Sequence, residues 1–199
     1  PLVQEVFTDT EPVTRLAAAK GHHVGKSLTL GTGYDFFDKT SRERAIIRIE
    51  LEKPYMLVIA FPCHVWSSLN NLSGKNSVQS RRQREKVLVD FATQLARIQM
   101  EGNRLFLIEN PDTSRAWSLV ASLQKLCKDR RVHVARFHQC MLGLTDVSGV
   151  PHRKATKVVT NSEQVFNALD MCRCDKSHDH SWVIGGRKVT APSGHYPRK

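Results

Sequence analysis

The chain has 199 residues, and 40% of them are hydrophobic, which suffices for one domain with a buried core. It contains no apolar run long enough for a transmembrane helix, and its odd number of cysteines, five, argues against a disulfide scaffold. The formal net charge of +11 indicates a polyanionic partner, because lysines and arginines release condensed counterions when they bind phosphates. We therefore expect an intracellular, nuclear protein that binds DNA, with RNA left open as a partner and no membrane contact.

Apolar strand patterns alternate with helical patterns along most of the chain. We predict strands over 3–7, 24–30, 55–61, 105–108, 132–137 and 156–160, and helices over 12–20, 41–53, 81–100, 117–126 and 162–169. A polar loop is expected over 64–80. The alternation predicts an α/β fold with a Rossmann-like, doubly wound, mainly parallel sheet and helices on both faces. This domain should span residues 1–170, and residues 171–199 should form a short C-terminal extension that contains Cys and His.

Two chemically distinctive side chains directly follow two of the predicted strands. Cys63 comes after the apolar run YMLVIAF, and Glu109 comes after LFLI. Ligands bind at the carboxyl ends of parallel strands, so we expect the thiol and the carboxylate at one edge of the sheet. Each residue alone is more often structural, but the pair favours nucleophilic catalysis beside an acid that hydrogen-bonds a base. Nearby Arg and Lys side chains should lower the pKa of the cysteine.

Three short motifs in this chain follow one another in the same order as the motifs of a known enzyme family. The string PCHVWS at 62–67 resembles the nucleophile motif of the cytosine-C5 DNA methyltransferases. Glu-Asn-Pro at 109–111 is similar to the Glu-Asn-Val/Pro element of that family. GVPHRK at 149–154, which precedes a predicted strand, is similar to its Gly-Val-Pro-Gln-x-Arg-x-Arg segment. More narrowly, residues 1–170 resemble the compact methyltransferase-like domains of some retrotransposon polyproteins.

The resemblance implies methyl transfer from S-adenosylmethionine to C5 of cytosine in DNA. Cys63 would add to C6 of a cytosine flipped out of the duplex, and Glu109 would hydrogen-bond N3 and the exocyclic amine. Arg153 or Lys154 would hold the cytosine O2 or a nearby phosphate. The residues expected to contact DNA, in the loop that would close over the base and at the start of the next helix, are Ser67, Lys75, Arg81, Arg82 and Arg84.

The expected cofactor site departs from the family pattern. The first strand of the family ends in Phe-x-Gly-x-Gly, whereas this chain has Phe-Thr-Asp-Thr at 7–10, without glycine. The resemblance places S-adenosylmethionine near Phe7, Thr8, Thr10, Thr29, Asp35 and Pro62. The missing glycines favour an alternative function, a catalytically silent methyltransferase-like domain that binds nucleic acid or a partner protein. A thiol-dependent transferase of another kind is a third interpretation, which the basic stretch at 75–86 disfavours.

The predicted extension contains residues of the types that bind zinc. Cys172, Cys174, His178 and His180 lie close in sequence, and thiolates and imidazoles are zinc ligands. The Cys-x-Cys spacing differs from the usual Cys-x-x-Cys of zinc sites, so we do not expect Cys172 and Cys174 to share one ion. We expect a structural zinc site of Cys174, His178 and His180, with Cys140 as a distant fourth ligand. An exposed polar loop with incidental Cys and His is an equally weighted alternative.

Overall fold

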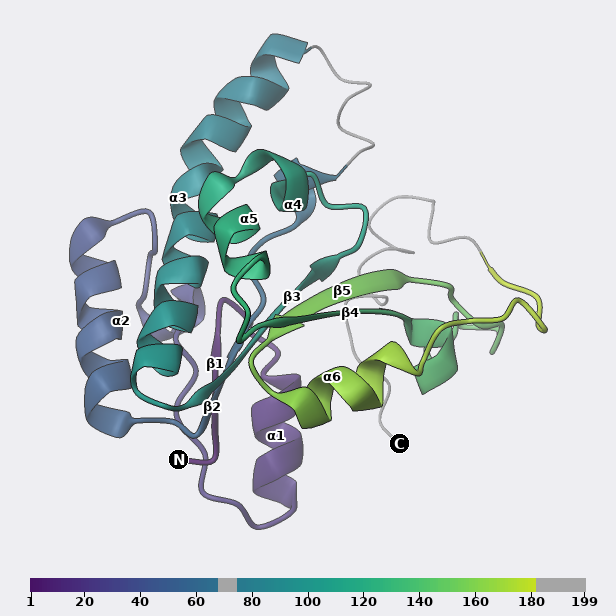
Figure 1. The fold of residues 1–199 in the computed structure, drawn as a ribbon, viewed down its shortest axis with the longest axis horizontal. Helices are drawn as coiled ribbons and strands as arrows, with labels where there is room; N and C mark the ends of the chain where they lie inside the picture. The colour runs from purple at the N-terminus through teal and green to yellow at the C-terminus, as the bar shows by residue number, and fades with distance from the viewer. Residues whose placement is uncertain (68–74, 182–199) are drawn as a thin grey trace.

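The computed structural model describes residues 1–67 and 75–181, and it confirms the α/β class (Figure 1). The five strands are β1 (Val3–Val6), β2 (Met56–Ile59), β3 (Leu105–Pro111), β4 (His133–His138) and β5 (Ala155–Thr160). The helices are α1 (Pro12–Ala19), α2 (Lys39–Glu52), α3 (Lys75–Glu101), α4 (Ala116–Leu119), α5 (Ala121–Cys127) and α6 (Glu163–Asp170). Three short 3-10 helices are η1 (Leu30–Thr32), η2 (His64–Trp66) and η4 (Gln139–Leu142). No helix within the described residues is both long and apolar enough to cross a membrane.

The sheet is mixed, with the order β1-β2-β3-β5-β4. Parallel pairing joins β1 to β2 and β2 to β3, as predicted. The last strand, β5, lies between β3 and β4 and is antiparallel to both. The segment between β4 and β5 contains η4 but no α-helix that crosses a sheet face, and a parallel return usually needs such a helix. The expected mainly parallel pairing is therefore found only on the N-terminal side of the sheet.

Alternate residues of each strand face two different helical layers. Val6, Ile59, Ile108 and Val159 are register partners across four strands, and all four are fully buried in the core with α2 and α3. The opposite face is covered by α1 and α6. There the Glu5 side chain reaches α1, and His133 of β4 stacks on Phe166 of α6. Figure 1 shows α2 and α3 on one side of the strands and α1 and α6 on the other.

The strand expected over 24–30 does not form, and that prediction was wrong. The segment follows β1 through hydrogen bonds from the Gly25 and Leu28 amides to the Val3 and Glu5 carbonyls, at 2.8 and 2.9 Å. Only Leu28 makes a strand-type bridge, to Val6. A side chain at Gly25 would meet Cβ of Gln4 at 3.0 Å. The two amides are three residues apart, whereas the carbonyls that they bond are two apart, so the regular ladder of a paired strand is interrupted.

Two helix boundaries also differ from the predictions. Helix α3 begins at Lys75 instead of 81, so the polar loop expected over 64–80 is shorter. Polar residues misled the prediction there, because the exposed face of a helix is also polar, and Val78 is buried below it. The helix expected over 117–126 is divided into α4 and α5 at Val120. This buried residue has extended backbone angles, φ −104° and ψ 109°.

Candidate thiol site and Cys/His centre

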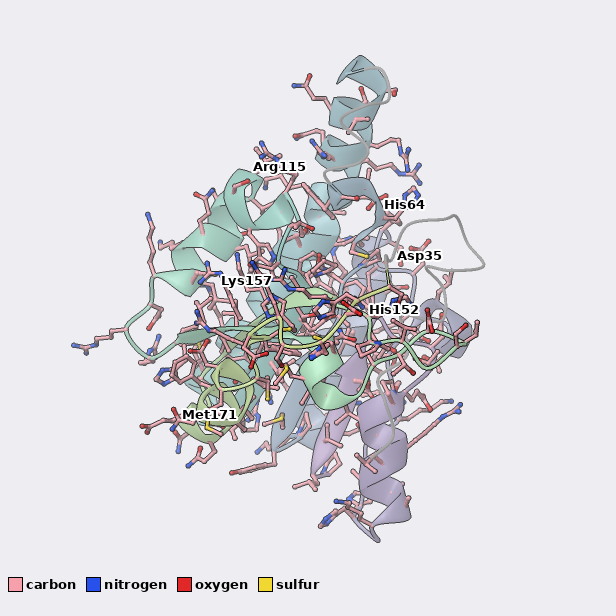
Figure 2. All side chains as sticks on the ribbon, turned by 90° about the vertical axis from the view of Figure 1, so that its right-hand side faces the viewer. Asp35, His64, Arg115, His152, Lys157 and Met171 are labelled. Atoms are coloured by element: carbon pink, nitrogen blue, oxygen red, sulfur yellow. The ribbon has the colours of Figure 1, made fainter. Side chains whose placement is uncertain are left out.

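The candidate thiol site begins where β2 ends, in a loop that is anchored on both sides of Cys63. Before the cysteine, the buried Asn110 at the end of β3 donates a hydrogen bond from Nδ2 to the Phe61 carbonyl at 2.8 Å. After it, the Trp66 amide donates to the Cys63 carbonyl at 3.0 Å, and the Trp66 ring is buried in the core. These contacts hold Cys63 at the edge of the sheet. Figure 2 shows the molecule from the side toward which β4 runs, with His64 of η2 labelled.

The structure brings Cys63, Glu109 and Lys154 together at this edge. Cys63 is an exposed residue, yet its thiol is packed closely enough by neighbouring atoms that desolvation raises its pKa. The charge of Lys154 lowers the pKa, and the charge of Glu109 raises it. The expectation of a lowered pKa was wrong, because the desolvation of the sulfur outweighs the attraction of the lysine. The resting residue is therefore a thiol, with a carboxylate and an ammonium group beside it.

Arg153 and Lys154 influence different groups, although they are adjacent in sequence. The charge of Lys154 lowers the pKa of Cys63. Arg153 is exposed, and its charge acts on His138 and His180, whose pKa values are lowered first by burial. Of the two residues proposed to hold a base or phosphate, only Lys154 thus acts on the thiol.

The arginines expected to contact DNA lie against the Cys63 loop and its neighbours. Arg82 donates to the carbonyls of Val65 and Ser67 at 3.1 and 3.3 Å. A guanidinium nitrogen of Arg81 lies 3.2 Å from Nδ1 of His64. These contacts fasten the start of α3 to η2. Further along α3, Arg84 lies over the Phe37 ring, and the side chain of Lys75 lies outside the described residues.

The residues expected around S-adenosylmethionine lie in loops that contact one another and the core. Phe7 has a left-handed φ of 74°, a conformation suited to glycine, and its ring packs against Phe36 in the interior. A side chain at Gly31 would meet the Asp9 carboxylate at 3.1 Å, so the loop after β1 and η1 are in close contact. The hydroxyls of Thr8 and Thr10 are 3.3 Å apart.

The remaining expected cofactor residues are also held in local contacts. The Thr29 amide donates to the Thr32 hydroxyl, and the Asp35 carboxylate accepts from the Phe37 amide. Glu5 accepts a 2.6 Å hydrogen bond from the Thr14 amide at the start of α1, where a helix would otherwise attract an anionic ligand group. These contacts are local, and the loop at 7–10 carries side chains where the family pattern has glycines. The expected Pro62 is exposed in the Cys63 loop.

A second candidate centre lies where the extension meets η4. The ligand atoms of Cys140, Cys174, His178 and His180 all lie within 4.8 Å of one another, so the cluster can hold a metal ion. The Cys174 sulfur is 3.8 Å from Nε2 of His178 and 3.3 Å from Nε2 of His180. Tetrahedral zinc, with bonds of about 2.0 Å to nitrogen and 2.3 Å to sulfur, separates its ligand atoms by roughly 3.3–3.8 Å. The two sulfur–nitrogen distances from Cys174 lie in that range, and the whole set spans no more than 4.8 Å.

Cys172 is close in sequence to this cluster but does not belong to it. Cys172 points elsewhere, with its thiol 3.4 Å from the Ala168 carbonyl. Burial and the neighbouring Cys174 raise the pKa of Cys140 to about 11. The backbone fixes the extension as well, because the Cys174 amide donates to Nδ1 of His138 at 3.0 Å. The predicted set of four is therefore assembled from η4 and the extension.

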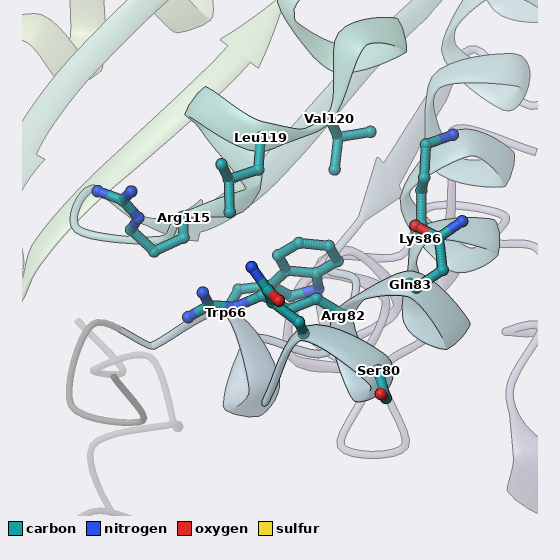
Figure 3. Close-up of a pocket in the computed structure, with 9 residues that line it drawn as sticks. Trp66, Ser80, Arg82, Gln83, Lys86, Arg115, Leu119 and Val120 are labelled. Carbon is teal, nitrogen blue, oxygen red and sulfur yellow. The ribbon is translucent and has the colours of Figure 1, made fainter. Parts of the chain in front are cut away.

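Sequence reasoning missed a cavity of about 800 Å³ on the far side of the Cys63 loop (Figure 3). Its lining includes Trp66, Arg82, Lys86 and Arg115, which come from η2, α3 and the residue before α4. No periodicity or motif marks Arg115, and it reaches the cavity because its amide donates to the Trp66 carbonyl at 2.8 Å.

The comparisons with known proteins give this chain no relative. No protein-family model matches it, and a search of curated proteins finds no match either.

Proposed function

We propose that this chain is a nucleic-acid-binding domain of the cytosine-C5 methyltransferase type, which receives an unstacked cytosine at the Cys63 edge. The observation that carries the proposal is the meeting of Cys63, Glu109 and Lys154 at one edge of the sheet, where β2 and β3 approach their carboxyl ends and β5 begins. A carboxylate can accept a hydrogen bond from the cytosine amine, and an ammonium group can donate to O2 or to phosphate. The net charge of +11 supports a polyanionic partner.

Binding without methyl transfer is the form of this function that the geometry supports best. The loop at 7–10 lacks the glycines of the family's cofactor loop, and Phe7, Thr29 and Asp35 take part in local contacts. Methyl transfer remains a second candidate function, and the observation that favours it is the thiol itself. A domain that only binds nucleic acid has no need of a cysteine beside a carboxylate and a lysine.

A binding experiment with matched oligonucleotides tests the proposal. Fluorescence anisotropy would compare duplexes that carry one mismatched cytosine or one mismatched thymine, since thymine reverses the donor and acceptor pattern at positions 3 and 4. We expect the protein to prefer cytosine, and Glu109→Gln to lose most of that preference, because an amide can donate to thymine O4 as well as accept from the cytosine amine. Absence of nucleic-acid binding at physiological salt would refute the proposal.

A methyl-transfer assay separates the two candidate functions. Labelled S-adenosylmethionine and duplex DNA are incubated with the protein and with its Cys63→Ala variant. We expect no label on DNA from either one. Label at C5 of cytosine with the parent protein, lost in the variant, would establish the enzyme and overturn the silent form.

We also propose that the Cys/His cluster holds a zinc ion with a structural role. The support is the mixed thiol and imidazole donor set at tetrahedral spacing, with two of its four members, Cys140 and Cys174, buried. A bound ion would join the extension to η4, which is next to β4. The complete set of four protein ligands would leave no open coordination position, and this is typical of structural zinc.

A further inference from the structure

The cavity beside the Cys63 loop has cationic walls. Arg82, Lys86 and Arg115 contribute the charged side chains of its lining, which includes no Asp or Glu. Gln79 and Gln83 add amide groups. Trp66, Leu119 and Val120 provide apolar surface, and Figure 3 shows the Trp66 ring between the α3 side chains and those around α4. A site of this composition suits an anion attached to a less polar group.

The cavity brings several positive charges close together. Lys86 pairs with Asp90 at 2.5 Å, and Arg82 donates hydrogen bonds to the carbonyls of Val65 and Ser67. Arg115 forms no ion pair with any described residue. Burial and the charge of Arg115 both lower the pKa of Arg82, as expected when two guanidinium groups lie near each other. An anion between these two groups would relieve their repulsion.

The cavity and the thiol share one short loop. Cys63 precedes η2, and Trp66 ends it, with the Trp66 amide hydrogen-bonded back to the Cys63 carbonyl. The Trp66 carbonyl in turn accepts from the Arg115 amide. Three residues of 3-10 helix advance about 6 Å, so the thiol residue and the cavity wall at Trp66 are separated by a single short helical turn. A strand with one base at Cys63 can therefore place a neighbouring phosphate in the cavity.

We propose that this cavity binds the phosphodiester backbone of the nucleic-acid strand whose base lies at Cys63, with Arg115 and Arg82 as the phosphate ligands. The inference rests on the proposed function and adds the place where the strand runs. Guanidinium groups bind phosphate oxygens in a bidentate manner, and this fixes the position of the strand without reading its sequence. The exposed Leu119 side chain in the same lining offers packing for the attached sugar.

The test compares Arg115→Gln with Arg15→Gln in binding of a fluorescent 12-nucleotide single strand at several salt concentrations. Both variants remove one positive charge, but Arg15 is an exposed residue of α1, on the other face of the sheet. We expect Arg115→Gln to raise Kd about five- to tenfold and to reduce the slope of log Kd against log salt by roughly 0.7, as for one lost phosphate contact. Arg15→Gln should change Kd less than about twofold.

Further measurements test whether the variant is misfolded and whether the cavity binds a small anion instead of a nucleic-acid strand. The backbone hydrogen bond of Arg115 survives substitution, so thermal unfolding should be unchanged, and Arg115→Lys should recover the salt slope. If Arg115→Gln behaves like Arg15→Gln while Glu109→Gln still abolishes the cytosine preference, the phosphate site is refuted and the proposed function stands. Tight binding of inorganic phosphate that the oligonucleotide does not displace would also refute it. If the parent protein does not bind the strand, the proposed function itself fails.

Discussion

The reactivity of Cys63 depends on three influences that act on one sulfur atom. Desolvation and the charge of Glu109 raise its pKa, and the charge of Lys154 lowers it. Because the raising influences win, the residue rests as a thiol, and a bound group that neutralises Glu109 would favour the thiolate. Under the proposed function, a base that neutralises Glu109 would thereby increase the nucleophilicity of the cysteine.

Alkylation of Cys63 measures this balance. Removal of the lysine charge in Lys154→Gln should raise the pKa further and shift the rise of iodoacetamide reactivity to higher pH, since the thiolate is the reacting form. Removal of the carboxylate charge in Glu109→Gln should shift it to lower pH. Mass spectrometry of the Cys63 peptide over a pH series gives the rate. Shifts in the same direction for both variants would contradict the arrangement of charges.

At the scale of elements, a side chain of β1 accepts a hydrogen bond from a backbone amide at the start of α1. The buried Glu5 of β1 accepts from the Thr14 amide in the first turn of α1. A carboxylate at a helix N-terminus is favourable, but burial still raises the pKa of Glu5. The folded protein thus holds a proton on Glu5 more tightly than the unfolded chain does.

The stability of α1 should accordingly depend on pH through Glu5. A raised folded pKa gives a contribution that is complete below the unfolded pKa and is lost as pH rises through the folded pKa. Glu5→Gln keeps an acceptor for Thr14 and removes the titration. Its Tm relative to the parent protein should therefore increase from about pH 4 to about pH 8. Glu50→Gln, at an exposed position of α2, should show no such trend. Parallel Tm curves for Glu5→Gln and the parent would disprove this role.

At the scale of the whole molecule, the Cys/His cluster joins parts of the chain that are distant in sequence. Cys140 lies in η4, whereas Cys174, His178 and His180 belong to the extension. The same extension contacts the segment before β5, where the Ser181 amide donates to the Pro151 carbonyl at 3.0 Å. A metal ion here would hold the extension near Lys154, and it would thereby support one wall of the thiol site.

Metal analysis and thermal unfolding test the zinc proposal. We expect about one zinc ion per chain, and a Tm that falls by several degrees after chelation, because metal binding contributes to folding free energy. Cys174→Ser should lose the metal. Cys172→Ser is the matched control and should retain it, because the Cys172 thiol contacts the Ala168 carbonyl instead. Equal loss of zinc from both variants, or no zinc in the parent protein, would count against the site.

The sequence by itself determined the elements and part of the site, because local apolar patterns depend on near neighbours. The buried strands, the helices α1, α2 and α6, and the placement of Cys63 after β2 all followed from those patterns. Glu109 was expected after its strand, but β3 continues to Pro111, so Glu109 lies within it. Local pattern also predicted the Cys174, His178 and His180 group, since those residues are close in sequence.

Only the tertiary structure decided the features that depend on distant segments. It placed β5 between β3 and β4 and reduced the segment at 24–30 to an irregular edge beside β1. It brought Arg115 to the cavity beside Trp66, and it raised the pKa of Cys63. Strand pairing, cavity walls and desolvation are all set by atoms far away along the chain, and a local sequence pattern carries no record of them.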